Sequence, residues 1–264
     1  MPRYRAFANG IMADVFAPPS KGRQEVALFL PGFPATLGEN SLTKLLQKTG
    51  YTVVFPHYRG TYDSSGEFTP IEAIATAREI IEGLSAGEMR DTKSNDRASL
   101  PSKVTVCCGY SFGCFVTLHV APSLVDVRSV LFFSPALTYG PAEVSSGFRE
   151  SGLPFLDYVR RSRPLTYRLG AEPVWRNFYE GKMNLVGNEV QRAALTVDCF
   201  LGGRDGSFDQ ALFVKNFKTI VQGAFPAALR IDLHVVKQGE HSIDTLVPEL
   251  ERNVSTLLPN NSGD

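Results

Sequence analysis

Short apolar runs alternate with longer amphipathic segments along most of this chain. The runs contain few polar side chains, as expected of strands buried on both faces of a sheet. They are EVALFL (25–30), YTVVF (51–55), KVTVCC (103–108), VRSVLFF (127–133), ALTVDCFL (194–201) and LRIDLHVV (229–236). Because helical segments separate them, we predict an α/β fold with a mostly parallel central sheet of about eight strands and helices on both faces.

Several segments between the runs have apolar residues at helical spacing. They are 41–50, 69–87, 111–124, 210–223 and 243–258. The second has clear end signals, because Thr69 fits the N-cap position, Pro70 the first helical position and Gly87 the end of the helix. Near the start of the chain, Asn9 and Gly10 separate two apolar stretches and favour a tight hairpin turn, which predicts two antiparallel strands.

Two parts of the chain interrupt this rhythm. Residues 88–102 are polar and lack periodicity, which predicts an exposed connection. Residues 137–192 follow a strand end and carry many aromatic residues, several arginines and helix-sized pieces. Insertions at that edge of a parallel sheet lie over the ligand crevice. We therefore predict a helical lid within a single domain of residues 1–264, whose tail, 259–264, is frayed.

Charge and composition limit the classes of partner. Basic and acidic residues number 27 each and the net charge is zero, which argues against a nucleic-acid partner. No apolar stretch reaches the roughly 18 residues of a membrane span, and the first residues lack a secretory apolar region. The four cysteines, with Cys107 and Cys108 adjacent, are poorly spaced for a disulfide or zinc site. We interpret them as reduced core thiols of a cytoplasmic protein without a bound metal.

The pattern G-x-S-x-G occurs twice, around Ser85 and around Ser111. Ser85 lies where a helix is predicted to end, which gives its glycines a structural explanation. Ser111 lies where a buried strand turns abruptly into a helix, so its hydroxyl would project above the sheet edge from a strained backbone. The N–H of Phe112 would then stabilise an oxyanion at a helix N-terminus. We predict Ser111 as a nucleophile; the alternative is that its flanking glycines only permit close packing.

A serine nucleophile needs a histidine that removes its proton. His241 comes directly after the last predicted strand, at the sheet edge where Ser111 is expected, and is the predicted base. His119 is expected inside a helix and His234 inside a strand, while His57 could line the site but precedes the serine. The alternative for His241 is a polar residue that flanks the last helix.

The histidine in turn needs an acid that orients its ring. Asp205 lies in a glycine-rich loop after a predicted strand and is the chosen residue, although an aspartate beside a glycine is also common in turns. Its competitors are Asp209, which is nearest, Asp198 inside the strand and Asp244 at the start of the last helix.

This constellation resembles the α/β-hydrolase family, and the segment 51–68 resembles its dienelactone hydrolase and acyl-peptidase branch. The resemblance covers most of the chain and implies a Ser111, Asp205, His241 catalytic triad with a nucleophile elbow. It also implies a second oxyanion donor in the loop after residues 25–30. There this chain has Pro31-Gly32-Phe33-Pro34 in place of the His-Gly pair or glycine run of many relatives. Since proline has no N–H, only Gly32 and Phe33 of these four residues can donate. Phe33 aligns with the residue after the family's glycine, so the resemblance implies an oxyanion hole formed by the amides of Phe33 and Phe112.

These residues together predict a serine hydrolase that cleaves a carboxylic ester of a small molecule without a cofactor. The same groups would serve a thioesterase, an amidase or a peptidase, because the triad acts only on the carbonyl. The alternative of another class is a non-catalytic interaction protein with this fold. Aromatic residues of the insertion could line an acyl pocket or form the insertion's own core, and the oligomeric state is left open.

Overall fold

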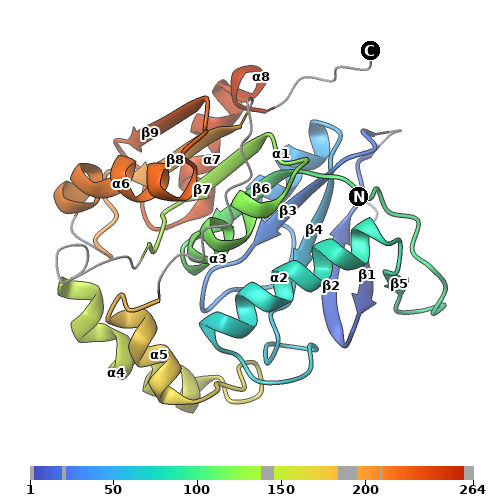
Figure 1. Cartoon of the computed structure of the whole chain (residues 1–264), viewed down its shortest axis with the longest axis horizontal. Helices are drawn as coiled ribbons and strands as arrows, with labels where there is room; N and C mark the ends of the chain where they lie inside the picture. The colour runs from blue at the N-terminus through green and yellow to red at the C-terminus, as the bar shows by residue number, and fades with distance from the viewer. Residues whose placement is uncertain (1–2, 20–21, 138–145, 184–194, 208–209, 259–264) are drawn as a thin grey trace.

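The computed structural model describes residues 3–19, 22–137, 146–183, 195–207 and 210–258, with only the backbone for Arg3, 146–152 and Leu212. In these residues one nine-stranded sheet has the order β5-β1-β2-β4-β3-β6-β7-β8-β9 (Figure 1). The strands are β1 (Arg3–Ala8), β2 (Ile11–Phe16), β3 (Val26–Leu30), β4 (Thr52–Pro56), β5 (Arg90–Asp91), β6 (Val104–Tyr110), β7 (Ser129–Phe133), β8 (Thr196–Gly202) and β9 (Arg230–Val236).

The strands from β4 to β9 in this order are parallel, whereas β1, β2 and β5 are antiparallel to their neighbours. The predicted mostly parallel sheet is therefore confirmed. The expected number of strands, about eight, missed β5 in the segment 88–102. This two-residue strand pairs with Ala6 and Phe7 at the sheet edge, and it is too short to carry an alternating pattern.

Helices cover both faces of the sheet (Figure 1). They are α1 (Ser41–Lys48), α2 (Pro70–Ser85), α3 (Phe112–Val120), α4 (Ser146–Ser162), α5 (Glu172–Tyr179), α6 (Gln210–Ala224), α7 (Ile243–Arg252) and α8 (Val254–Leu257). The buried side chains of α2, α3 and α6 belong to one apolar cluster with the sheet, and those of α1, α7 and α8 belong to a second cluster. The sheet thus forms the middle layer between two helical layers, as the sequence predicts.

Local end signals act as expected. Asn9 and Gly10 have φ of 51° and 73° at the turn between β1 and β2, and the Thr69 side chain caps α2 by accepting a bond from the Glu72 amide. The last helical segment is the exception, since it was expected to be continuous over 243–258. It is divided into α7 and α8 at Asn253, which is the C-cap of one helix and the N-cap of the other.

The insertion is helical, since it contains α4 and α5. Its parts 138–145 and 184–192 lie outside the described residues, as does the predicted tail, 259–264. Between α4 and α5, the segment 166–170 runs beside the segment 60–68. The amide of Tyr62 bonds the carbonyl of Thr166 over 2.8 Å, and Arg168 exchanges such bonds with Gly60 and Phe68 over 2.7 Å each. The insertion is therefore tied by main-chain hydrogen bonds to the connection that follows β4.

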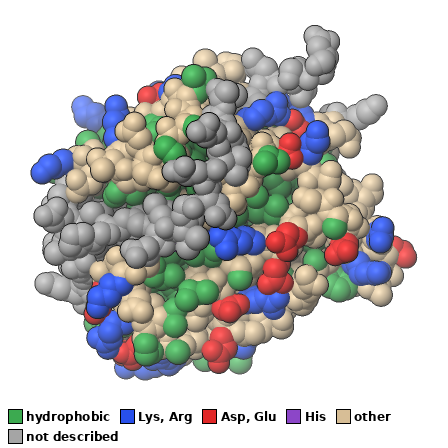
Figure 2. Space-filling model, in the orientation of Figure 1, with side chains coloured by type: hydrophobic (Ala, Val, Ile, Leu, Met, Phe, Trp, Pro, Cys, Tyr) green, Lys and Arg blue, Asp and Glu red, His purple; other side chains and the backbone are tan. Residues whose placement is uncertain are grey.

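The distribution of surface charge and the burial of the cysteines agree with what the composition predicts. Basic and acidic side chains are mixed across the described part of the face in Figure 2. All four cysteines are buried free thiols, which confirms their place in the core. Among the helices of the described residues, we find none with the length and apolar character that spanning a bilayer requires.

Candidate active site

Ser111 is the sharp turn between β6 and α3. Its φ of 51° and ψ of −118° lie where few residues other than glycine are found, so the expected backbone strain is confirmed. The amide of Ser111 donates to the carbonyl of Phe133 on the next strand over 2.9 Å, and its carbonyl accepts from Cys114 over 3.0 Å. The strained residue is thus held on both sides by main-chain bonds.

The two glycines around Ser111 are required by close backbone approach. A Cβ on Gly109 would lie 2.6 Å from the Cα of Cys114, and a Cβ on Gly113 would lie 1.9 Å from the carbonyl oxygen of Leu30. The second G-x-S-x-G pattern differs in every respect, because Ser85 is the exposed last residue of α2. Ser85 thus ends a helix, as expected.

The side chains of Ser111, His241 and Asp205 form one line of hydrogen bonds. The Nε2 atom of His241 lies 3.0 Å from the Oγ of Ser111, and its Nδ1 atom lies 2.8 Å from the Oδ2 of Asp205. The carboxyl of Asp205 is fully buried, whereas 30% of the histidine side chain is exposed. With Nδ1 protonated toward the carboxylate, Nε2 is free to accept a proton from the serine hydroxyl.

Two interlocked loops hold Asp205 and His241 at this distance. The strands before them pair in register, with Gly202 of β8 opposite Val236 of β9, and the amide of Arg204 donates to the carbonyl of Gly239 over 2.8 Å. A Cβ on Gly202 would lie 2.6 Å from that same carbonyl oxygen. The loops therefore meet through their backbones, and a glycine is needed for this contact.

The environment of Asp205 favours its ionised form. Burial works to raise the pKa of the carboxyl, but hydrogen bonds from the His241 ring and the Ser207 amide outweigh it and lower the pKa below its ordinary value. The Ser207 bond, 3.0 Å to Oδ1, occupies the oxygen that does not face the histidine. Asp205 is thus a buried carboxylate with hydrogen bonds to both oxygens.

The loop 31–35 lies directly against the start of α3. A Cβ on Gly32 would lie 3.2 Å from the Cβ of Ser111 and 3.1 Å from the ring of Tyr110. Phe33 follows, and its ring centroid is 6.2 Å from that of Phe112. Because Phe112 is the first residue of α3, its N–H has no acceptor within the helix. The amides of Phe33 and Phe112 thus belong to the two segments that border the serine.

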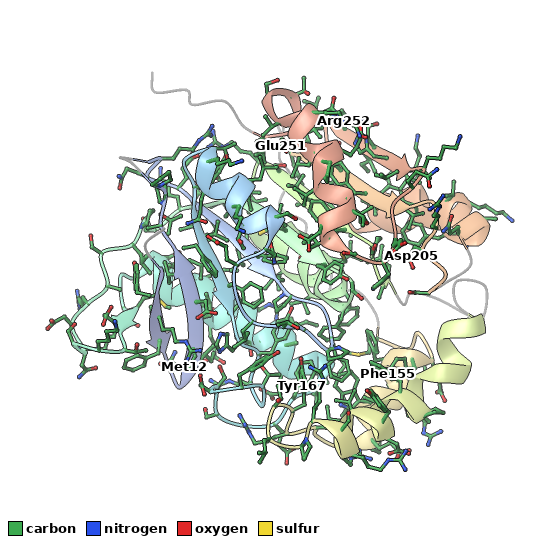
Figure 3. The ribbon with its side chains drawn as sticks, turned by 180° about the vertical axis from the view of Figure 1, so that it is seen from behind. Met12, Phe155, Tyr167, Asp205, Glu251 and Arg252 are labelled. Atoms are coloured by element: carbon green, nitrogen blue, oxygen red, sulfur yellow. The ribbon has the colours of Figure 1, made fainter. Side chains whose placement is uncertain are left out.

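Aromatic rings surround Phe33. Its centroid lies 5.0–5.7 Å from those of four rings, which belong to Phe68, Phe155, Tyr167 and Trp175. The last three belong to the insertion, and Figure 3 labels Phe155 on α4 and Tyr167 in the segment before α5. Trp175 and Tyr167 are buried, whereas Tyr158 is exposed. Part of the insertion's aromatic set thus forms a core shared with the loop 31–35, while Phe155 and Phe33 keep partly exposed faces. The side chain of Phe148, also expected in this group, lies outside the described residues.

The other histidines lie apart from this line of bonds. His119 is inside α3 and His234 inside β9, as expected. His57 was considered as a residue that lines the site, but it is buried with its Nε2 3.6 Å from Asp14 and its ring 5.5 Å from that of Tyr62.

Two of the competing aspartates bond partners other than His241. Asp198 is buried in β8, where it bonds Arg230 over 2.8 Å and His234 over 2.9 Å. Asp244 is in the first turn of α7 and accepts a bond from the Ser41 amide over 3.2 Å. Asp209 lies outside the described residues.

Tyr110 is a site residue that the sequence reasoning missed. Its hydroxyl donates to the main-chain carbonyl of His241 over 2.9 Å, and the two rings are 5.6 Å apart. The position before the nucleophile carried no signal for this role, because a tyrosine at the end of a buried strand is equally expected in a core. The partner is 131 residues away in the chain.

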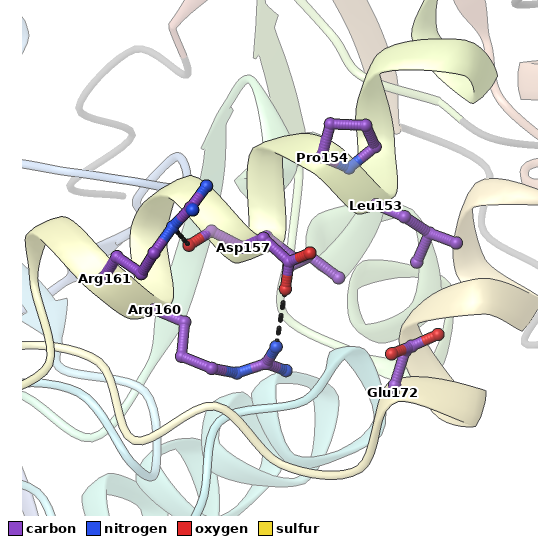
Figure 4. A pocket seen from close by; sticks show the side chains of 7 residues that line it. Leu153, Pro154, Asp157, Arg160, Arg161 and Glu172 are labelled. Carbon is purple, nitrogen blue, oxygen red and sulfur yellow. Dashed lines mark hydrogen bonds and ion pairs between the residues drawn. The ribbon is translucent and has the colours of Figure 1, made fainter.

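A hollow of about 420 Å³ is lined by side chains of α4 and by Glu172 of α5 (Figure 4). Its charged residues pair with their neighbours, as Arg160 does with Asp157 over 2.7 Å and Arg176 with Glu172 over 2.6 Å. None of the predicted catalytic residues lines it. Within the described residues, no three His, Cys, Asp or Glu side chains gather in a way that would hold a metal ion.

Several proteins of known structure share this fold. An esterase of Pyrococcus furiosus is similar with a TM-score of 0.62 and 15% identity, over 97% of this chain and 89% of that one. An alpha-beta serine hydrolase homologue of Coxiella burnetii has a TM-score of 0.58 and 14% identity, over 98% and 97% of the two chains. A Xanthomonas campestris serine hydrolase, described as lacking a lid, has a TM-score of 0.56 and 14% identity, over 98% and 96%.

Sequence comparison assigns the family. The search of curated proteins found no match for this chain. The model of one family, described as "Alpha/beta hydrolase family", matches residues 27–243, which is well over half of the sequence. This chain belongs to the alpha/beta hydrolase family and is a hydrolase by that membership.

Proposed function

We propose that this hydrolase cleaves carboxylic esters of small molecules through a Ser111, His241, Asp205 triad. The observation that carries the proposal is the continuous line of hydrogen bonds, 3.0 Å from Ser111 to His241 and 2.8 Å from His241 to Asp205. Nucleophile, base and orienting acid are thus within hydrogen-bond reach of one another. The strained backbone of Ser111 is in keeping with a functional role.

The reaction follows from these positions. The Oγ of Ser111 attacks the ester carbonyl while the Nε2 of His241 takes the hydroxyl proton. The resulting tetrahedral intermediate collapses, the bond to the leaving oxygen breaks, and His241 delivers its proton to the departing alcohol. Water then attacks the acyl enzyme by the same route and releases the acid. Throughout, the Asp205 carboxylate holds the Nδ1 proton and stabilises the imidazolium.

The oxyanion is stabilised by two main-chain amides. Phe112 supplies one at the first turn of α3, where the helix dipole adds to the effect. Phe33 supplies the other, from the loop that approaches Ser111 through Gly32. One such donor is worth about 10²–10³ in turnover. No cofactor takes part in this scheme.

The rings near the serine favour an apolar acyl group. Phe33 and Phe155 have partly exposed faces beside buried aromatic neighbours, and such surfaces bind hydrocarbon chains. Phe155 belongs to the insertion, and we propose the insertion as the lid of this site. A Pyrococcus furiosus protein of this fold is an esterase, which supports the choice of an ester over a thioester or an amide.

Hydrolysis of p-nitrophenyl esters of graded chain length tests the proposal. We expect measurable turnover that varies with acyl length and falls by at least about 10³-fold in Ser111→Ala. Ser85→Ala, at the exposed end of α2, is the matched control and should retain parental activity. Unchanged hydrolysis by Ser111→Ala would remove this residue from the mechanism. An aminoacyl anilide cleaved faster than every ester would instead identify an amidase.

A further inference from the structure

The loop 31–35, which carries the proposed Phe33 amide, is held by tyrosine hydroxyls. The two prolines of this loop have no N–H and cannot anchor it as donors. Instead, the Tyr58 hydroxyl donates to the carbonyl of Pro31 over 3.0 Å. At the other end, the Tyr62 hydroxyl donates to the carbonyl of Ala35, and the amide of Ala35 donates to the Tyr167 hydroxyl over 2.7 Å.

Both main-chain polar groups of Ala35 bond tyrosine hydroxyls. Its carbonyl accepts from Tyr62 and, at 3.3 Å, from Tyr167, while its amide donates to the latter. Each tyrosine hydroxyl therefore uses its single proton, and the oxygen of Tyr167 also accepts. Both polar groups of one peptide residue are fixed by two side chains whose rings lie 5.8 Å apart.

The two tyrosines that hold Ala35 come from segments that are themselves joined. Tyr62 lies in 60–68 and Tyr167 in 166–170, which exchange the main-chain bonds described above. The Arg168 side chain adds bonds to the carbonyls of Tyr62, Ser64 and Gly66. The rings of Tyr167 and Phe33 also touch, with centroids 5.1 Å apart. The insertion thus reaches the oxyanion loop through a rigid pair of segments.

We propose that Tyr62 and Tyr167 are positioning residues that set the height of the Phe33 amide above Ser111, so that the insertion controls oxyanion stabilisation. This inference rests on the proposed function. Removal of either hydroxyl should destabilise the bound transition state more than the bound substrate. The reason is that the ester carbonyl oxygen accepts a strong hydrogen bond from the Phe33 amide only when it becomes an oxyanion.

Tyr62→Phe and Tyr167→Phe test this, since each removes one oxygen and keeps the ring. We expect kcat for p-nitrophenyl acetate to fall about 10- to 100-fold in each, with KM changed by less than about threefold, because the lost interaction is confined to the transition state. The double variant should lose less than the product of the two, because both hydroxyls hold Ala35.

Affinity for a trifluoromethyl ketone, which forms a tetrahedral adduct with the serine, should fall by the same factor as kcat/KM. A merely structural role would not produce this match, because lost folding lowers the active fraction and leaves the affinity of the folded protein unchanged. Tyr51→Phe is the matched control: its hydroxyl accepts a 2.9 Å bond from Arg23 beside the opposite end of β4. It should leave kcat and ketone affinity unchanged.

The results distinguish failure of the positioning role from failure of the proposed function. If Ser111→Ala abolishes hydrolysis but both tyrosine variants keep parental kcat and ketone affinity, the positioning role is wrong and the triad stands. If KM rises while kcat is unchanged, the tyrosines serve substrate binding and the inference is also overturned. If Ser111→Ala retains activity, the proposed function itself fails.

Discussion

The hydroxyl of Tyr110 donates a 2.9 Å hydrogen bond to the main-chain carbonyl of His241. The residue before the proposed nucleophile thus holds the loop that carries the proposed base. Burial, together with the negative charge of Asp205, raises the pKa of Tyr110 to about 12, so the donor proton is retained at neutral pH. One short turn of chain positions both partners of the proton transfer.

Tyr110→Phe should therefore loosen the histidine loop without removing a reacting group. We expect kcat/KM to fall about 3- to 10-fold, which corresponds to the net free energy of one ordinary hydrogen bond. Tyr158→Phe, on the solvent-exposed side of α4, should have no effect. A Tyr110→Phe enzyme with parental kinetics would mean that this bond does not orient the base.

Asp205→Asn should be far more damaging. The amide cannot hold the Nδ1 proton as a carboxylate does, so the imidazole loses its correct tautomer and kcat should fall by about 10³- to 10⁴-fold. Because the pKa of Asp205 is lowered in the folded protein, ionisation of this group adds stability above its ordinary pKa. That contribution is lost as pH falls through the lowered value. Steady-state kinetics at neutral pH measure the first effect.

Asp198→Asn supplies the matched control, because the buried Asp198 and the partly exposed His234 are a second Asp-His pair, also 36 residues apart. This carboxylate additionally bonds Arg230. We expect a loss of about 1.5–3 kcal/mol in the free energy of unfolding, as for a hydrogen bond to a charged group, with kcat of the folded protein retained. A large fall in kcat here would show that the readout reports folding instead of chemistry.

The two G-x-S-x-G patterns should respond differently to alanine. In Gly113→Ala the new Cβ meets main-chain oxygens of Leu30 and Pro31, which cannot move aside alone, and we expect a loss of at least about 3 kcal/mol in stability. In Gly83→Ala the nearest atoms are side-chain atoms of Ala8 and Met89 at 3.2 and 3.3 Å. Helix propensity partly offsets that crowding. The free energy of unfolding of Gly83→Ala, measured by urea denaturation, should therefore change by no more than about 1 kcal/mol. Equal losses in the two variants would mean that Gly113 is not required by close backbone approach.

His119 should make the fold sensitive to acid. Burial and the nearby Arg78 lower its pKa to about 4 from 6.5. Between these values the unfolded chain binds a proton that the folded protein does not, so stability falls as pH falls through this window. His119→Gln should remove up to about 3 kcal/mol of that loss. Urea unfolding of both proteins at pH 7.5, 6 and 4.5 measures it, and parallel stability curves would rule it out.

Much of the fold follows from local signals in the sequence. Buried strands, helix ends such as Thr69 and the Asn9-Gly10 turn are encoded within a few neighbouring residues. The meeting of Ser111 and His241 was also predictable, because parallel strands bring the loops at their carboxyl ends to one edge of the sheet. The proximity of these two residues, which are 130 positions apart in the sequence, therefore follows from the arrangement of the strands.

Other features depend on contacts that no local pattern encodes. The tyrosines that hold Ala35 are 27 and 132 residues away from it, and a tyrosine in such a segment is equally expected in a core. His57 was considered for the site because it follows a strand, yet its ring is buried beside Asp14. The edge strand β5 depends on pairing with β1 and not on its own composition.

Labelling with a fluorophosphonate probe, followed by mass spectrometry of the peptides, tests the central claim most directly. The account predicts one adduct, on the Oγ of Ser111, that forms rapidly in the folded protein and is lost in His241→Ala and after denaturation. Absence of the adduct, or its formation on Ser85 or another serine, would contradict it.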